Sequence, residues 1–175
     1  MTDRHEVLER WRAQEAAIRA RAPSPGVSSP DALKSLSGLE FLGRIIAGTL
    51  PPPPIAETLD FLLIEAERGR IVFQSHPHKR HYNPLGSVHG GYFCTLLDSA
   101  LGCAVHSMLP AGTGYTTLEL KVNLVRPLTD RTGLIRAEGH VVHVGKSTGI
   151  AEGRIVDAEG KLYAHATTTC LIFAL

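Results

Sequence analysis

The fold is decided by residues 90–109, which read GGYFCTLLDSALGCAVHSML. Apolar side chains cover this segment almost all round when it is wound as a helix, so other elements must enclose it. Residues 91–109 carry a single formal charge, Asp98, near their centre. A carboxylate at the centre of a membrane-spanning helix costs about 2.5–3.5 kcal/mol. We therefore predict a buried helix rather than a membrane span.

Strand-like patterns lie on both sides of this helix in the sequence. Two such segments precede it, residues 56–67 and 69–75, and a tight turn at Glu67-Arg68-Gly69 separates them. Four follow it, at residues 115–126, 134–144, 147–156 and 162–173, and Asp157-Ala158-Glu159-Gly160 provides hairpin chemistry between the last two. Leu118, Leu120, Val122 and Leu124 alternate with polar residues, which predicts one buried face. The economical fold is α+β, with one antiparallel sheet wrapped around the central helix.

The first 54 residues form a proline-rich extension. Seven of the eleven prolines lie between Pro23 and Pro54. Apolar spacing predicts a weak amphipathic helix over residues 3–20 and a second helix over residues 30–47, which Gly48 ends. The run Pro51–Pro54 prevents that helix from resuming. We divide the chain into an N-terminal helical extension, residues 1–54, and one domain, residues 55–175, and the sequence assigns no role to the extension.

Composition limits the classes of partner. The chain has 175 residues with 18 Lys and Arg against 17 Asp and Glu, a net charge of +1. Near-neutrality argues against a broad basic face for nucleic acid or an anionic membrane. Three cysteines form no CxxC pair, and residues 1–21 lack the apolar core of a secretory signal. We therefore expect a cytoplasmic protein without nucleic-acid or membrane partners.

The residues with chemical potential lie in and just after the stretch Asn83-Pro84-Leu85-Gly86-Ser87-Val88-His89-Gly90-Gly91. Two glycines at a helix start allow close approach to first-turn amides, which together with the helix dipole can polarise a carbonyl group. Asp98 is the one carboxylate on the helix, where burial would make it a plausible base. Taken singly, each feature is equally a turn, a cap or an internal hydrogen bond. Together they fit addition of water to a carbonyl.

Geometry separates the two halves of this constellation. Gly90 and Asp98 are eight residues apart, so about 12 Å of helix lies between them. Hydrogen-bond reach is about 3 Å, so one carbonyl carbon cannot easily be served by both groups of one chain. If both belong to one site, two subunits share it, and a two-fold dimer has two equivalent sites.

The chain resembles the PaaI-type acyl-CoA thioesterases of the hotdog-fold superfamily over about residues 55–173. The resemblance rests on Asn83, His89-Gly90-Gly91 and Asp98, followed by TTLELKVNLVRP at residues 116–127, VGKS at 144–147 and DAEGKLYA at 157–164. It implies a hotdog fold, a homodimer often paired into a tetramer, and hydrolysis of a small, medium-chain or aromatic acyl-CoA. It implies no cofactor, because coenzyme A is part of the substrate.

The resemblance also implies roles by position. Asn83 would orient the thioester or the loop, and the Gly90 amide would polarise the carbonyl. Asp98 of the neighbouring subunit would be the general base or the nucleophile. Thr117 would position water, and His89 would contact the carbonyl or support the loop.

Coenzyme A carries phosphates that need local cations. Our candidates are Arg126, Lys146 and Arg154 near predicted strand ends, together with Gly91 and the Gly145–Ser147 turn. Lys146 fits best, since its turn resembles the nucleotide-side loop of the family. Each of these cations taken alone is equally a solvated surface residue.

Three alternatives stay open at this stage. His76, His78, His81 and His89 fall within fourteen residues, but their spacing matches no compact zinc set, so we expect no metal. A hotdog dehydratase or hydratase is a second enzymatic reading, disfavoured because the helix carries no Glu. A non-catalytic acyl-CoA sensor, with the N-terminal helices as its output, belongs to another class. Acyl preference and the choice between base and nucleophile stay open.

Overall fold

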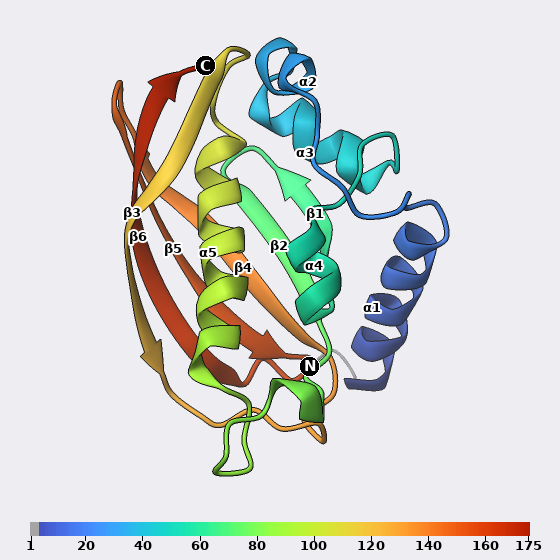
Figure 1. The fold of residues 1–175 in the computed structure, drawn as a ribbon. Coiled ribbons are helices and arrows are strands. Elements are labelled where there is room, and N and C mark those ends of the chain that lie inside the picture. The colour runs from blue at the N-terminus through green and yellow to red at the C-terminus, as the bar shows by residue number, and fades with distance from the viewer. Residues whose placement is uncertain (1–3) are drawn as a thin grey trace.

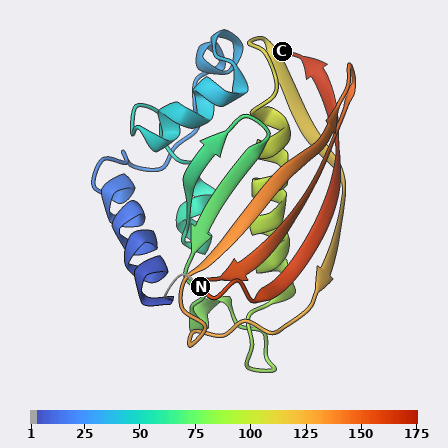
Figure 2. The ribbon, with the colours of Figure 1, turned by 180° about the vertical axis from the view of Figure 1, so that it is seen from behind.

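The protein is an antiparallel sheet of six strands around one long helix, as seen in a computed structural model that describes residues 4–175 (Figures 1 and 2). The strands lie in the order β1-β2-β4-β5-β6-β3. Their bounds are β1 Phe61–Glu67, β2 Arg70–Ser75, β3 Thr113–Leu124, β4 Ile135–Val144, β5 Thr148–Asp157 and β6 Leu162–Ala174. This arrangement confirms the predicted α+β hotdog architecture, and the last four strands lie within two residues of their predicted bounds.

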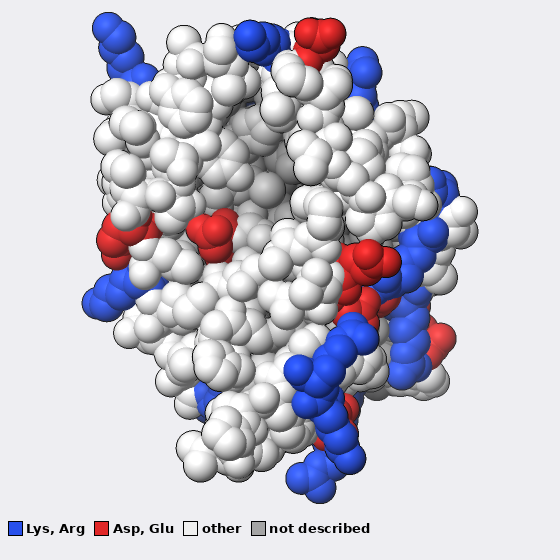
Figure 3. Space-filling view, viewed as in Figure 1, with Lys and Arg blue, Asp and Glu red and all other residues white. Residues whose placement is uncertain are grey.

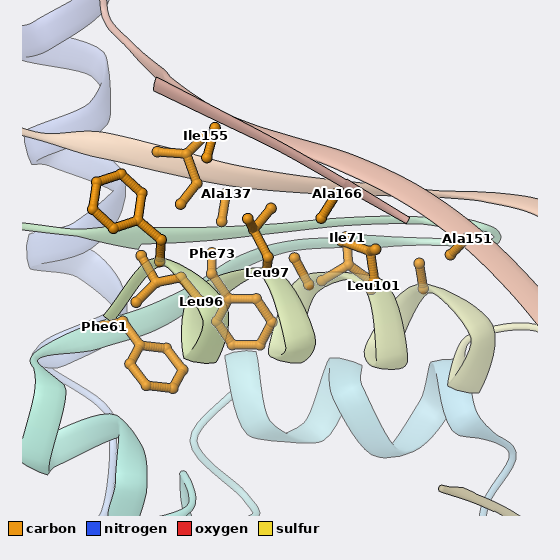
Figure 4. Close-up of a cluster of buried hydrophobic side chains, with 14 of the residues drawn as sticks. Phe61, Ile71, Phe73, Leu96, Leu97, Leu101, Ala137, Ala151, Ile155 and Ala166 are labelled. Carbon is orange, nitrogen blue, oxygen red and sulfur yellow. The ribbon is translucent and has the colours of Figure 1, made fainter. Parts of the chain in front are cut away.

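The central helix is α5, Gly90–His106, and its apolar side chains fill the space inside the curved sheet (Figure 4). Leu96, Leu97 and Leu101 are fully buried there. Small residues on the strands allow the helix to lie close to the sheet. A Cβ atom on Gly139 of β4, for example, would overlap the backbone of α5 at Ala100. No helix in the described residues is long and apolar enough to span a membrane.

Four N-terminal helices precede the sheet in the chain, and the first, third and fourth of them pack against the edge strand β1 (Figure 1). They are α1 Arg4–Arg19, α2 Pro30–Ser35, α3 Gly38–Ile46 and α4 Pro54–Leu59. On the outer face, Ile18 of α1 packs against Leu62 and Ile64 of β1. On the inner face, Leu42 of α3 joins the main core together with Phe61 and Leu63. The extension is therefore packed onto the sheet rather than projecting from it.

The extension corrects two sequence predictions. The helix predicted over residues 30–47 is broken at Leu36 and Ser37, because Ser37 caps a new helix by a reciprocal hydrogen-bond pair with Glu40. The strand predicted from Ala56 is a helix until Leu59, because Pro54 is well suited to the first position of a helix. Asp60 then turns the chain with φ 52°, and β1 begins at the next residue.

A β-bulge in β3 overturns the predicted single buried face of that strand. The register with β6 shifts between Thr117 and Glu119, so Leu118 is the extra residue. Leu118 is 60% exposed and Leu124 is 54% exposed, whereas Leu120 and Val122 pack against the core. Strict alternation fails because the bulge shifts the strand by one residue, and because β3 is an edge strand with nothing beside it.

Candidate active site

A direct hydrogen bond joins two of the predicted site residues. Thr117 Oγ1 donates to Asp98 Oδ1 at 2.8 Å, which connects β3 to the middle of α5. Asp98 is exposed in the single chain, so the prediction of a buried carboxylate is wrong at this level of assembly. The reason is geometric, because Asp98 faces β3, the last strand of the sheet, and no further strand covers it there. The carboxylate is therefore open to solvent or to a second molecule.

The bulge at Leu118 explains how Thr117 reaches this carboxylate. Before the bulge, Tyr115 and Thr117 point to α5, and after it, Leu120 and Val122 do so. Side chains of an unbroken strand alternate strictly between its two faces. An unbroken β3 with Leu120 and Val122 in the core would turn Thr117 away from Asp98. The bulge therefore serves core packing and the polar pair at once.

The start of α5 leaves one backbone amide free. His89 is the N-cap, and its Nδ1 accepts a hydrogen bond from the Gly91 amide at 2.9 Å. The His89 amide in turn donates to the His81 carbonyl at 2.8 Å. The Gly90 amide has no acceptor within the described residues. Of the predicted contacts, Gly90 is thus free for an incoming oxygen, while Gly91 is engaged by His89.

Asn83 holds the loop before this helix. Its Oδ1 accepts from the Leu85 amide at 2.9 Å, and its backbone amide donates to the Ser87 carbonyl at 2.8 Å. Its Nδ2 donates to Ser87 Oγ at 3.2 Å. Both ends of the side chain are therefore engaged, which favours the loop-orienting role over direct contact with a thioester.

An apolar cavity of about 580 Å³ has Asp98 and Thr117 in its lining. It lies between α5, β3 and the N-terminal extension, and Figure 3 shows the corresponding hollow, whose walls are white with an acidic side chain beside it. Phe41, Phe73 and Tyr115 contribute aromatic lining. This volume is within the range of small-molecule pockets. A polar pair thus faces a space suited to an apolar group.

The other titratable groups in the cavity stay neutral. Burial raises the pKa of the Cys103 thiol to about 12, so this cysteine is not a nucleophile at neutral pH. Burial also raises the pKa of Tyr115 and lowers the pKa of His106. No Lys or Arg is among the described lining residues. Asp98 is therefore the one carboxylate available for chemistry in this cavity.

The predicted coenzyme A contacts are spread over the molecule. Arg126 follows the end of β3 and donates to the Leu162 carbonyl. The turn at residues 145–147 lies at the other end of the sheet, where neighbouring Gly149 packs on Val105 near the end of α5. Arg154 pairs with Glu138 of β4 at 3.0 Å. A single chain does not bring these residues together, and their role stays a prediction.

The histidine cluster has structural partners. His78 Nε2 lies 2.7 Å from Asp60 Oδ2, and His81 Nδ1 accepts from the His78 amide at 3.1 Å. The His81 ring stacks on Tyr92 at a centroid distance of 4.6 Å. Residues 4–175 hold no group of three or more side chains suited to a metal ion.

Sequence reasoning missed the contribution of the extension to the cavity. Phe41 and Ile45 of α3 and the Pro51–Pro54 run line it, although they are distant in sequence from Asp98. His106, at the last residue of α5, was also missed as a lining residue. The apolar spacing of α3 indicated a buried face, but nothing local showed which surface it would cover.

Comparison with known proteins gives a consistent result. The family model of the thioesterase superfamily matches residues 85–164. The 1,4-dihydroxy-2-naphthoyl-CoA hydrolase of Listeria monocytogenes is 25% identical over 118 residues, covering 67% of this chain and 94% of that protein. A protein of Saccharolobus solfataricus, provisionally named an esterase, is 34% identical over 113 residues, covering 64% of this chain and 78% of its own.

A solved structure shares the fold as well. It is a phenylacetic acid degradation-related protein of Ralstonia eutropha, provisionally described as a thioesterase. Its TM-score is 0.68 at 28% identity, over 74% of this chain and 98% of that one. The matched family region contains Asp98, Thr117 and the start of α5.

Proposed function

The chain belongs to the thioesterase superfamily and is a thioester hydrolase, and on that premise we propose that its substrate is an acyl-CoA. The observation that carries the proposal is the Asp98–Thr117 pair beside an apolar cavity. The carboxylate can act at a thioester carbonyl while the cavity holds an apolar acyl group. The name of the Listeria relative, a naphthoyl-CoA hydrolase, supports the coenzyme A part of this assignment.

The free Gly90 amide supplies the electrophilic half of the proposed reaction. It donates to the thioester oxygen, and the α5 dipole stabilises the negative charge that develops there. In the general-base route, Asp98 takes a proton from water, whose oxygen bonds to the carbonyl carbon. The carbon–sulfur bond then breaks, and coenzyme A leaves as a thiol after receiving the proton. In the nucleophilic route, a carboxylate oxygen of Asp98 bonds to the carbonyl carbon, the carbon–sulfur bond breaks, and the coenzyme A thiolate leaves and takes a proton from water. Water then cleaves the resulting anhydride to the free acid and Asp98.

The two halves come from different subunits in this proposal. Eight residues of α5 place Gly90 about 12 Å from Asp98 of the same chain, beyond the span of one carbonyl group. Asp98 therefore works with Gly90 of the partner subunit, and a two-fold dimer has two such sites. The exposed apolar side chains on and just after the free edge strand β3 support pairing there, with Leu118 60% and Val125 48% exposed. Further pairing into a tetramer is compatible with this arrangement.

A shared site also suits the scattered candidates for coenzyme A contact. Arg126 lies at the end of the sheet where α5 begins, and Lys146 lies at the opposite end. We propose that one coenzyme A meets Arg126 of one subunit and the Gly145–Ser147 turn of the other. Arg154 contributes less, because Glu138 already neutralises it.

Release of free thiol from a panel of acyl-CoAs tests the function. Wild type should turn over at least one neutral acyl-CoA, and Asp98→Ala should lose at least a hundredfold in rate. Tight binding without turnover would replace the proposal with a sensor. Addition or loss of water without thiol release would replace it with a hydratase.

Mixed dimers test the shared site. Asp98→Ala and Gly90→Pro are each expected to be inactive, and proline at the first helical position removes the amide proton without breaking α5. Mixing the two should restore activity in one of the two sites of each hybrid dimer. If hybrids are no more active than the parents, the shared site is wrong. A single turnover in ¹⁸O-labelled water then tests the nucleophilic route. Label found in Asp98 shows that water attacked the aspartyl carbon of an anhydride, whereas a general base leaves Asp98 unlabelled.

A further inference from the structure

We infer that the N-terminal extension closes the acyl-binding site and sets the size of the acyl group that the enzyme accepts. The cavity beside Asp98 is that acyl site, and this assignment rests on the proposed function. We call its extension side the extension wall, formed by Val27, Leu33, Phe41, Ile45 and Pro51–Pro54. The ligand is a neutral, bulky, apolar acyl group.

The cavity runs along α5 in the direction away from Gly90. Asp98 lines it near the middle of the helix and His106 lines it at the helix end, eight residues and about 12 Å further along. The ring of His106 lies 5.6 Å from that of Phe41 and 5.3 Å from that of Tyr115. An acyl group whose carbonyl carbon lies at Asp98 therefore extends between α5 and the extension wall.

The extension wall is held in place by hydrogen bonds to backbone carbonyl groups. The Gly38 amide donates to the Leu109 carbonyl at 3.0 Å, and a Cβ atom on Gly38 would overlap the His106 carbonyl group. The Gly26 amide donates to the Pro52 carbonyl at 2.9 Å, and Arg21 Nε donates to the Ile46 carbonyl at 2.7 Å. These bonds fix α3 and the proline run, so the wall is formed before the ligand enters.

The lining defines the chemistry of the ligand. Aromatic and proline side chains favour an apolar group, and the lining contributed by residues 4–175 contains no Lys or Arg. Cys103 and Tyr115 stay protonated, and burial keeps His106 neutral. An acyl group ending in a carboxylate would leave that charge unpaired inside the cavity, which is costly. The cavity therefore selects neutral acyl groups.

Acyl binding and carbonyl polarisation are assigned to different subunits in this arrangement. The extension wall lies in the same chain as the Asp98 that it accompanies, whereas the carbonyl is polarised by Gly90 of the partner subunit. Acyl selection thus takes place in one subunit and carbonyl activation needs two. This separation makes the inference testable apart from catalysis.

Binding measurements test the wall directly. In an Asp98→Ala background, dissociation constants are measured by calorimetry for a short-chain, a bulky and an ω-carboxylated acyl-CoA. Phe41→Ala should shift the bulky-to-short preference toward the bulky ligand by about tenfold, and Phe41→Trp should shift it the opposite way. Ile45→Ala provides a second enlargement if Phe41→Ala does not fold, as judged by thermal unfolding. Val142→Ala, at an exposed β4 residue that does not line the cavity, is the matched control.

The outcomes separate this inference from the proposed function. Opposite shifts for the larger and smaller side chains, with the carboxylated ligand at least tenfold weaker, support the wall. Ratios within twofold of the Val142→Ala control for all wall variants, or no acyl-CoA binding at all, overturn it. Failure of the proposed function would be seen in a different experiment, as absence of thiol release from wild type with every acyl-CoA. The binding ratios are measured without turnover and therefore do not depend on that result.

Hybrid dimers locate the wall. In these hybrids the only working site combines Asp98 of one subunit with Gly90 of the other. Phe41→Ala should change the acyl preference of the dimer when it is placed in the subunit that supplies Asp98, and should leave it unchanged when it is placed in the subunit that supplies Gly90. A change that follows the Gly90 subunit instead contradicts the inference.

Discussion

The two edge strands of the sheet are treated in opposite ways. At one edge, β1 has seven residues, and its side chains are covered by α1 on the outer face and by α3 and α4 on the inner face. At the other edge, β3 has twelve residues, a bulge and an exposed Leu118. Unprotected edges invite pairing with another chain, so covering β1 leaves β3 as the edge where association can occur. The edge that carries Thr117 is also the edge that is left open.

The covered edge is secured by a buried polar cluster as well as by apolar packing. Arg136 of β4 is 5% exposed, lies 4.3 Å from the Trp11 ring centroid and pairs with Glu65 at 3.0 Å. Its Nη2 donates to Gln14 of α1 at 2.6 Å. A buried arginine with all these partners is costly to disrupt. The extension is therefore fixed at β1 with a specific orientation, which is what a pocket wall requires.

The largest expected effect comes from placing a charge on the open edge. Leu118→Asp should dissociate the dimer and lower the rate of thiol release about a thousandfold, because each active site then lacks the oxyanion donor, the Gly90 amide of the partner subunit. Val142→Asp is the matched control, since Val142 is also at a bulge and 61% exposed, but on the internal strand β4. Sedimentation velocity and thiol release are measured together. A Leu118→Asp protein that stays dimeric and active would refute the role of the β3 edge.

A smaller effect is expected at the covered edge. Trp11→Ala should cost about 3 kcal/mol of unfolding free energy, because it removes a large buried side chain and the ring beneath Arg136. Urea denaturation measures the loss, and Arg10→Ala on the exposed side of α1 is the control. The dimer should persist in both variants. Dissociation in Trp11→Ala would show that the two edges are not independent.

Much of the fold could be predicted because its signals are local. The apolar segment at residues 90–109 predicts a buried helix, and the turn residues Asp157–Gly160 predict a hairpin between the two strand-like segments beside them. The N-terminal helices were harder. Pro54 both ends one possible helix and begins another, and only packing on β1 decides between them. The break at Ser37 does have a local signal, because Ser37 and Glu40 have capping-box spacing, and the close approach of Gly38 to α5 adds to it.

The candidate site was predicted as residue types but not as a geometry. Asp98 and Gly90 were identified by residue type and position on the helix, and Thr117 only through the family resemblance; the Asp98–Thr117 bond supports that grouping. The exposure of Asp98 could not be predicted, because it depends on which side of α5 the sheet leaves open. The bulge at Leu118 has no sequence signal such as glycine, since it arises from the conflict between aiming Thr117 and burying Leu120.

The next effect tests what the bulge contributes to the open edge. Thr117→Val keeps the shape of the side chain but removes the hydrogen bond to Asp98, and kcat should fall about tenfold. Thr117→Ser retains the hydroxyl and should recover most of that loss. Steady-state kinetics decide the matter, with thermal unfolding as the check on folding. Equal kcat values for the valine and serine variants would show that the hydroxyl has no part in the reaction.

The smallest effect is a pH dependence at the covered edge. Asp60 directly precedes β1 and contacts His78 and Arg19 at 2.7 Å each, which links α1 to the loop before α5. Burial opposes ionisation, but these hydrogen bonds outweigh it and hold the pKa of Asp60 below its usual value.

A lowered native pKa stabilises the fold above the unfolded value of about 3.9, and the contribution is lost as pH falls through the native value. Asp60→Asn provides the comparison, because asparagine also tolerates the left-handed φ of 52° at this position. The stability difference between wild type and Asp60→Asn should be less than about 1 kcal/mol at pH 6 and should shrink toward pH 2. Urea denaturation across this range measures it, and subtraction removes the titration of the other carboxylates. A difference that stays constant with pH would mean that Asp60 holds the extension by shape alone, and the covered edge would then owe its stability to apolar packing and Arg136.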